Sequence, residues 1–101
     1  MIFQIVHTHT NVTCPGQSAE QAKRFSEWWQ SVKKNPGVKI LAAYASSMDH
    51  TFHITVEADD YPTVAKAFGA LNTYGSGHMS PVLPLDQTIP WAEAGVFHAS
   101  K

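Results

Sequence analysis

The sequence contains little charge and almost no cysteine. Only 15% of its 101 residues are charged, against about 25% in a typical soluble domain. Its formal net charge of −1 with neutral histidines provides no basic field, so we expect neither nucleic acid nor an anionic membrane as a partner. The single cysteine, Cys14, cannot form an intramolecular disulfide. That suits a reducing compartment, and we expect the cytoplasm.

Long apolar runs are also absent. No stretch approaches the roughly 18 apolar residues that a membrane span requires. The first seven residues lack the cationic lead, the long apolar core and the small-residue cleavage site of a signal peptide. We therefore expect a single domain over 1–101, with neither a membrane span nor a signal peptide. Histidine and tryptophan are plentiful by contrast, at six and three residues.

Alternation of apolar and polar residues predicts four strands, at 2–9, 38–45, 51–58 and 79–85. Pro81 and Pro84 restrict the last strand to an edge or a bulge. In the third strand, side chains two residues apart share a face. One face therefore carries Phe52, Ile54 and Val56, and the other carries His53, Thr55 and Glu57.

Two amphipathic helices are predicted between these strands. Ser18 and Gln21 form a capping box at the start of the first helix, which ends at 35–37. The second helix follows 59–60 and is stopped by Gly75 or Gly77. Their apolar faces contain Ala22, Phe25, Trp29 and Val32 in the first helix and Val64, Ala67, Phe68 and Leu71 in the second. Because Trp28 and Trp29 are consecutive, we expect only one of them to face the core.

The resulting order β-α-β-β-α-β predicts an α+β, ferredoxin-like fold. Right-handed crossovers give an antiparallel sheet of order 4-1-3-2, with two helices on one face. Residues 88–101 form a C-terminal tail, in which a short helix at 90–94 could dock Trp91 on a surface. The second sheet face has no cover within the chain. We expect a second copy to cover it, giving a homodimer or a higher oligomer.

The chain resembles the DUF3303-type domains of the dimeric α/β-barrel superfamily. The features that carry this resemblance are the strand at 1–8, the helix around 25–29, and the segments 37–41, 57–60 and 80–83. The resemblance implies two ferredoxin-like subunits whose sheets face each other in a barrel. Members of the superfamily include cofactor-independent monooxygenases, isomerases, haem enzymes and plain binding proteins, so it implies a fold and leaves the function open.

His7 and His9 form an H-x-H pair whose imidazoles share one face of a strand and can converge on one ion. We expect His78 nearby, because the fourth strand runs antiparallel to the first. Taking the third strand as parallel to the first places Glu57 at the same edge, and Cys14 follows in the next loop. The predicted metal ligands are thus His7, His9, His78 and Cys14, with Glu57 assisting. Such ligands suit copper, zinc, iron or nickel.

The sequence does not decide on which face of the sheet the side chains of His7 and His9 lie. If the odd-numbered residues of the first strand face the helices, His7 and His9 share that face and Glu57 does not. If the even-numbered residues face the helices, the pair and Glu57 line the cavity between two sheets. Gln4 interrupts the even face and favours the first arrangement, whereas the polarity of the pair favours the second. The histidines could also simply bond to water or to a backbone carbonyl.

A second candidate site lies on the uncovered face of the third strand. His53 and Glu57 could act there as catalytic acid and base, and Thr55 and Tyr44 could contact a small-molecule ligand or cofactor. A polar, water-filled interface with satisfied hydrogen bonds explains the same residues. His50 and His98 look like surface residues, and we assign them no role.

These patterns predict a dimeric protein that binds a transition metal or a small molecule, with an oxidoreductase-type enzyme as one form of that activity. Two alternatives remain. One is a cofactor-independent enzyme of the small monooxygenase or isomerase kind, and the other is a structural or regulatory dimer without a site. The sequence does not decide whether the protein is an enzyme.

Overall fold

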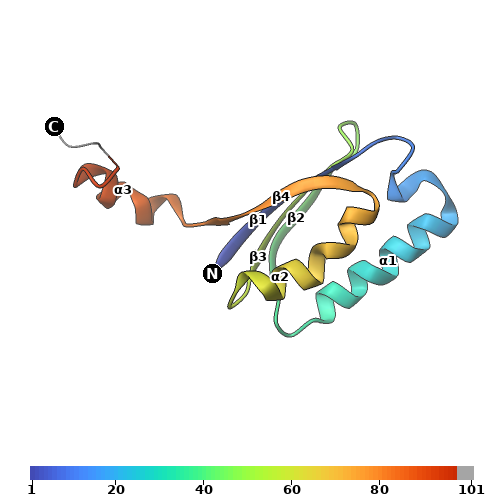
Figure 1. The fold of residues 1–101 in the computed structure, drawn as a ribbon, viewed down its shortest axis with the longest axis horizontal. Coiled ribbons are helices and arrows are strands. Elements are labelled where there is room, and N and C mark those ends of the chain that lie inside the picture. The colour runs from blue at the N-terminus through green and yellow to red at the C-terminus, as the bar shows by residue number, and fades with distance from the viewer. Residues whose placement is uncertain (98–101) are drawn as a thin grey trace.

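Four strands form one antiparallel sheet in the computed structural model, which describes residues 1–97 (Figure 1). Its elements are β1 (Ile2–His9), η1 (Pro15–Gln17), α1 (Ala19–Lys34), β2 (Lys39–Ser46), β3 (Thr51–Glu57), α2 (Tyr61–Phe68), η2 (Gly69–Thr73), β4 (Gly75–Val82) and α3 (Leu85–Glu93). The sheet order is β2-β3-β1-β4, which is the predicted order 4-1-3-2 counted from the other edge. The predicted α+β, ferredoxin-like topology is confirmed. His98 and the end of the predicted tail lie outside the described residues.

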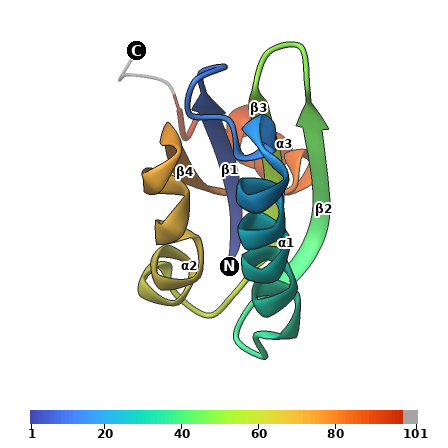
Figure 2. The ribbon, with the colours of Figure 1, turned by 90° about the vertical axis from the view of Figure 1, so that its right-hand side faces the viewer.

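Local signals account for both main helices. The Ser18 side chain accepts a hydrogen bond from the Gln21 backbone N–H at 3.1 Å and caps α1. Lys33 and Lys34 occupy the last turn of α1, where cations complement the helix dipole. At the start of α2, the Asp60 side chain accepts from the Thr63 N–H at 2.9 Å. Figure 2 shows that both helices cover the same face of the sheet.

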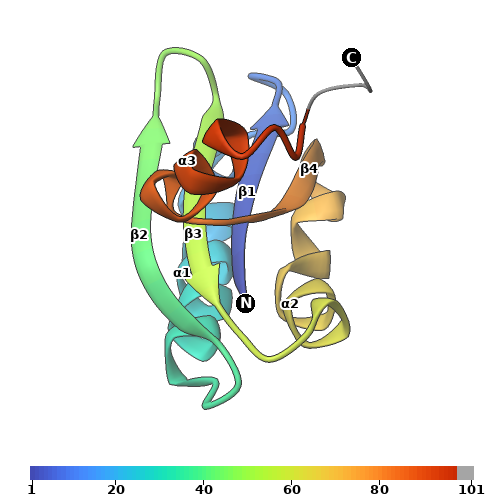
Figure 3. The same cartoon turned by 90° about the vertical axis from the view of Figure 1, so that its left-hand side faces the viewer.

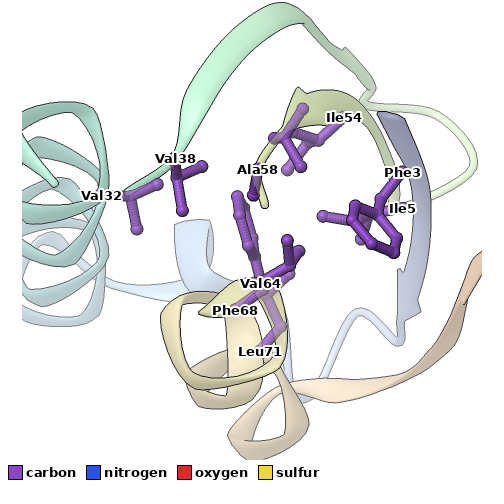
Figure 4. Packing of buried hydrophobic residues seen from close by; sticks show 10 residues of the cluster. Phe3, Ile5, Val32, Val38, Ile54, Ala58, Val64, Phe68 and Leu71 are labelled. Carbon is purple, nitrogen blue, oxygen red and sulfur yellow. The ribbon is translucent and has the colours of Figure 1, made fainter. Parts of the chain in front are cut away.

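The core lies between this face and the two helices (Figure 4). Odd-numbered residues of β1 and even-numbered residues of β3 point into it. Its buried apolar members are Phe3, Ile5, Val32, Val38, Ile54, Val56, Ala58, Val64, Phe68 and Leu71. The first of the two arrangements left open by the sequence is therefore the observed one, and His7 and His9 face the helices.

Both tryptophans of α1 pack against this core, so the prediction that only one could do so was wrong. Trp28 lies between Phe25 and Phe68, with ring centroids 5.3 and 5.9 Å away. Trp29 is also half-buried against the core. Consecutive helix residues are about 100° apart around the helix axis. The long indole side chains of Trp28 and Trp29 can both reach the core from positions separated by that angle.

The strand β3 runs antiparallel to β1, which corrects the expected position of Glu57. Ile2 pairs with Glu57 at one end, and Thr8 pairs with Thr51 at the other. The crossover through α1 brings β2 back parallel to β1, and the tight β2–β3 turn then reverses the chain. Glu57 thus lies at the start of β1, away from His9.

The last strand and last helix also differ from their predicted bounds. β4 spans Gly75–Val82 rather than 79–85, because Gly75 and Gly77 do not stop a helix but pair closely with β1. A Cβ on Gly77 would collide with the Val6 carbonyl oxygen. The position of β4 at the sheet edge is as predicted. The helix expected at 90–94 is the longer α3, which begins at Leu85.

Within residues 1–97, no helix packs on the second face of the sheet, which we call the open face (Figure 1). It carries the even-numbered residues of β1 and β4 and the odd-numbered residues of β3. Figure 3 looks onto it from the side on which α3 lies. Among residues 1–97, no helix is both long and apolar enough to cross a membrane.

Candidate metal centre

The candidate site begins with His9 at the end of β1. Its side chain is 6% exposed, and on β4 it faces Gly75, which has no side chain to compete for the space. Its ring packs against Phe52 at a centroid distance of 5.0 Å and against His7 at 5.5 Å. The β1 backbone and these neighbours hold His9 in one place.

The loop after β1 brings Cys14 to this strand end. Thr10 and Thr13 close the loop, since each backbone N–H donates to the other's hydroxyl, at 3.0 and 3.2 Å. Pro15 is buried and anchors the following turn. The Gly16 N–H donates to the Cys14 Sγ at 3.3 Å, so the thiol is oriented by the backbone.

The third member, His50, comes from the β2–β3 turn. Its φ of 51° lies in the left-handed region, which non-glycine residues rarely adopt. Its carbonyl accepts a hydrogen bond from the His9 backbone N–H at 3.0 Å. This bond fixes the turn against the end of β1 and brings the two imidazoles edge to face, with centroids 5.2 Å apart.

One nitrogen or sulfur atom from each of His9, Cys14 and His50 lies within 4.8 Å of the other two. His9 is buried, and the other two are partly exposed. Two imidazoles and one thiolate are ligands that zinc and copper accept. The cluster therefore has the chemistry of a three-ligand metal site.

Burial favours the neutral form of both buried histidines of β1. Burial lowers the pKa of His9, and the neighbouring His7 and His50 lower it further. Burial also lowers the pKa of His7, although its hydrogen bond to the Leu71 carbonyl partly opposes this. A neutral imidazole keeps a lone pair for a metal ion.

The Nδ1 atom of His9 is buried and has no hydrogen-bond partner within the described part of the chain. A buried polar atom without a partner costs roughly 1–3 kcal/mol. His7 Nδ1 is likewise buried and without a partner there, while His7 Nε2 donates to the Leu71 carbonyl at 3.0 Å. The paired histidines thus leave unsatisfied nitrogens beside the cluster.

A cavity of about 260 Å³ adjoins the three candidate ligands. His9, Cys14 and His50 line it on one side, and Phe25, Phe52 and Pro15 contribute apolar walls. A small ligand could therefore reach an ion bound at the cluster.

Comparison with known proteins supports the fold and gives the family. Residues 1–96 match the family described as Domain of unknown function (DUF3303). The chain belongs to this family. No curated protein matches it. Among solved structures it is similar to SCO4226 from Streptomyces coelicolor A3(2), with 17% identity over 83% of this chain and 98% of that chain and a TM-score of 0.56. At that identity, the likeness concerns the fold alone.

Only part of the predicted ligand set comes together in this DUF3303 chain. His9 and Cys14 lie close together, as expected. His7 lies beside them, but its Nε2 donates a hydrogen bond to the Leu71 carbonyl. His78 pairs with Val6 and therefore points to the open face, opposite His7. The antiparallel register explains this, because His78 is near the end of β1 along the strand but out of phase with His7.

The second predicted site lies on the open face. Tyr44 pairs with His53 across β2 and β3, and His53 and Val6 face each other across β3 and β1. The Thr55 hydroxyl donates to the Gln4 side chain. Glu57 lies on the same face, four residues from His53 along β3. The shared face of these residues is as predicted, and their catalytic and ligand-binding roles stay predictions.

His50 is a cluster member that the sequence analysis does not identify, because the pattern around it is that of a surface residue. A signal was available. In a ferredoxin-like sheet, the β2–β3 turn lies beside the end of β1, because β3 is antiparallel to β1. A histidine in that turn is therefore near a histidine that ends β1.

Proposed function

We propose that this protein binds one transition-metal ion, zinc or copper, through His9, Cys14 and His50. The observation that carries the proposal is the convergence of one ring nitrogen each of His9 and His50 and the Cys14 Sγ, all within 4.8 Å of one another. An ion bound at the cluster would take one nitrogen from each imidazole and the sulfur of Cys14.

The donor set narrows the choice of metal. A soft sulfur donor beside two imidazole nitrogens favours zinc or copper over the oxygen-preferring magnesium and calcium. Among the described residues, no carboxylate belongs to the cluster, and Glu57 lies at the other end of β1. We therefore propose zinc or copper before iron or nickel.

The geometry requires only a small contraction. A tetrahedral ion with bonds of about 2.0–2.3 Å sets its donor atoms roughly 3.5 Å apart, and the three donors here lie within 4.8 Å. His9 is fixed in a strand, whereas Cys14 and His50 belong to a loop and a turn. Small rotations of these two side chains would close the site around His9.

Three protein ligands leave one position of a tetrahedral ion for water or a ligand from the adjoining cavity. With zinc, that position would support Lewis-acid chemistry on a small molecule. With copper, it would support an oxidoreductase. The metal's identity thus decides between these activities.

A second candidate function is small-molecule binding on the open face, at Tyr44 and His53. The direct pairing of these two residues across β2 and β3 favours it, with Thr55 and Glu57 on the same face. This site needs no metal and corresponds to a cofactor-independent enzyme or a binding protein. The Tyr44 side chain is 72% exposed. A ligand bound there would therefore be enclosed only if another surface covered the open face.

Zinc titration of untagged, chelator-treated protein tests the metal site. We expect one ion per chain by calorimetry and a higher melting temperature. At a hundredfold excess over Kd, the stabilisation would be about 2.7 kcal/mol, or roughly 10–20 °C for a domain of this size. Cobalt in place of zinc should give the absorption band of a thiolate–cobalt bond.

Two variants make the titration specific. Cys14→Ser should weaken zinc binding at least tenfold and abolish the thiolate band. His53→Ala removes an exposed histidine from the open face and should bind zinc like the parent protein. Equal zinc binding by the parent and Cys14→Ser, or no binding by the parent, would overturn the proposed site.

A further inference from the structure

A second apolar cavity lies next to the one at the proposed metal site, between α1 and the edge strand β2. It measures about 190 Å³ and shares three lining residues, Phe25, Ala45 and Phe52, with the cavity of about 260 Å³ that adjoins the cluster. Its further walls include Trp29 and Ile54. The shared walls make the two cavities adjacent parts of one groove, which we call the α1–β2 groove.

Two alanines of β2 leave the space for this groove. Ala43 pairs with Ile54, and Ala45 pairs with Phe52, so both alanines lie on the face of the sheet that the helices cover. Both are nevertheless exposed. A larger apolar side chain at either position would fill the space beside α1, as protein interiors normally do. With only methyl groups there, the rings of Phe52 and Trp29 stay half-buried.

The α1–β2 groove leads away from the metal cluster along both elements. Ala45 is near the β2–β3 turn that belongs to the cluster, and Ala43 lies two residues further away along β2, or roughly 7 Å. On α1, Trp29 follows Phe25 by four residues, or roughly 6 Å. The rings of Phe25 and Phe52, with centroids 5.2 Å apart, line both parts. The groove therefore has a metal-binding end and an apolar end.

Charge favours an anion at the metal-binding end. Within residues 1–97, no lysine, arginine, aspartate or glutamate lines either cavity. Zinc binds cysteine as the thiolate and histidine as the neutral imidazole. In a zinc site of His9, Cys14 and His50, the thiolate would offset only one of the two positive charges of the ion. A ligand with one negative charge would offset the other, which the apolar walls solvate poorly.

We infer that the open position of the proposed zinc site takes the carboxylate of a small aliphatic acid, whose hydrocarbon chain lies in the α1–β2 groove. The carboxylate displaces the water of the fourth position and supplies an oxygen ligand that zinc accepts. The inference rests on the proposed function and names the class of ligand that the metal site binds.

The apolar end of the groove restricts this class to monocarboxylates. An amino acid or a dicarboxylate would place a second charge against Phe25, Phe52 and Trp29, at a high cost in desolvation. The size of the groove also suits a hydrocarbon chain. An apolar cavity of about 150 Å³ binds benzene, and the two cavities here measure about 260 and 190 Å³.

Calorimetry on zinc-loaded protein with straight-chain acids tests the ligand class. Complete burial of one methylene raises affinity about fourfold, and in a groove that is open on one side we expect roughly twofold. Octanoate should therefore bind at least tenfold more tightly than butanoate. Octylammonium has a similar tail and a positive head, and it should bind at least tenfold more weakly than octanoate. Zinc-free protein should also bind octanoate at least tenfold more weakly.

A variant that fills the apolar end tests where the chain lies. Ala43→Trp should weaken octanoate binding at least fivefold, while the affinities for butanoate and for zinc stay at the parent values. The matched control is Ala42→Trp, because Ala42 pairs with Thr55 and belongs to the open face. It should bind octanoate like the parent protein. Circular dichroism checks that both variants are folded.

A measurement on the parent protein gives the same location without a substitution. We expect a nuclear Overhauser effect between the terminal methyl group of octanoate and the Trp29 ring. Zinc uptake by the cluster would leave the metal site standing but overturn the inference if octanoate and butanoate bound equally, if neither zinc nor Ala43→Trp changed octanoate binding, or if the effect at Trp29 were missing. Failure of the protein to bind zinc would overturn the metal site, and the inference with it.

Discussion

His9 and His50 are joined twice, once through the backbone and once through their rings. The His9 N–H donates to the His50 carbonyl at 3.0 Å, and the two imidazoles meet edge to face at 5.2 Å. This arrangement keeps a histidine at a turn position with φ of 51°, where glycine or asparagine would be less strained. The ligand role that we propose for His50 would account for a histidine at such a position.

Replacement of His50 should separate metal binding from stability. His50→Gly removes a proposed ligand but relieves the left-handed strain, which costs a non-glycine residue about 1–2 kcal/mol. We expect zinc affinity to fall at least tenfold, while the metal-free protein melts at the same or a higher temperature. Calorimetry and thermal unfolding on the same samples measure both effects.

His50→Ala serves as the matched variant, because it also lacks the imidazole but keeps a Cβ at the strained position. It should lose zinc to the same extent and be less stable than His50→Gly. Undiminished zinc binding in both variants would show that His50 is not a ligand.

The metal-free protein should lose stability as the pH falls below about 6.5. Burial lowers the pKa of His7 and of His9 in the folded state, so the unfolded chain takes up protons first. The stabilisation is complete above the unfolded pKa of about 6.5 and is lost as the pH falls through the lowered folded values. Each histidine contributes at most about 1.4 kcal/mol per pH unit.

Urea unfolding between pH 5 and 7 measures this dependence, and His7→Leu should make it shallower. This variant also loses the hydrogen bond to the Leu71 carbonyl, so the slope with pH, and not the absolute stability, is the relevant quantity. A slope equal to that of the parent would exclude His7 as a source of the effect.

The fold could be predicted because its signals are local. Capping at Ser18 and Asp60 and alternation along 51–57 each act over a few residues, and their order then fixes the topology. The predicted start of β4 was wrong because of Gly75 and Gly77. A glycine that stops a helix and a glycine that pairs closely with a strand look alike in sequence. Only the partner backbone, at Val6 and Thr8, distinguishes them.

The site was predictable only in part, because it depends on register and on strand direction. The sequence indicated His9 and Cys14, which are near each other along the chain. His78 was expected beside His7, but a shift of one residue in register moves a side chain to the other face. Because β3 is antiparallel to β1, the residue near His9 is His50, and Glu57 lies at the opposite end of the sheet.

Gly77→Ala should destabilise the pairing of β1 with β4. A Cβ at this position would collide with the backbone of Val6 and His7, so the strands must move apart. We expect a loss of about 1–3 kcal/mol, measured as a lower urea midpoint. Gly69→Ala is the control, because no atom lies within 4 Å of a Cβ there, and its helical φ of −59° suits alanine. A gain of about 0.4–1 kcal/mol is expected for it, and similar effects at both glycines would contradict this account of β4.

The two adjacent tryptophans of α1 should differ in their contribution to stability. The Trp28 indole N–H donates to the Ala67 carbonyl at 3.2 Å and ties α1 to α2, whereas no such bond is found for Trp29 within residues 1–97. Both rings pack against the core, so Trp28→Phe and Trp29→Phe lose similar apolar area. Only Trp28→Phe also leaves a partly buried carbonyl without its donor. We therefore expect Trp28→Phe to be less stable than Trp29→Phe by about 1 kcal/mol. Urea unfolding followed by circular dichroism measures this difference. Equal urea midpoints for the two variants would show that packing alone joins the two helices.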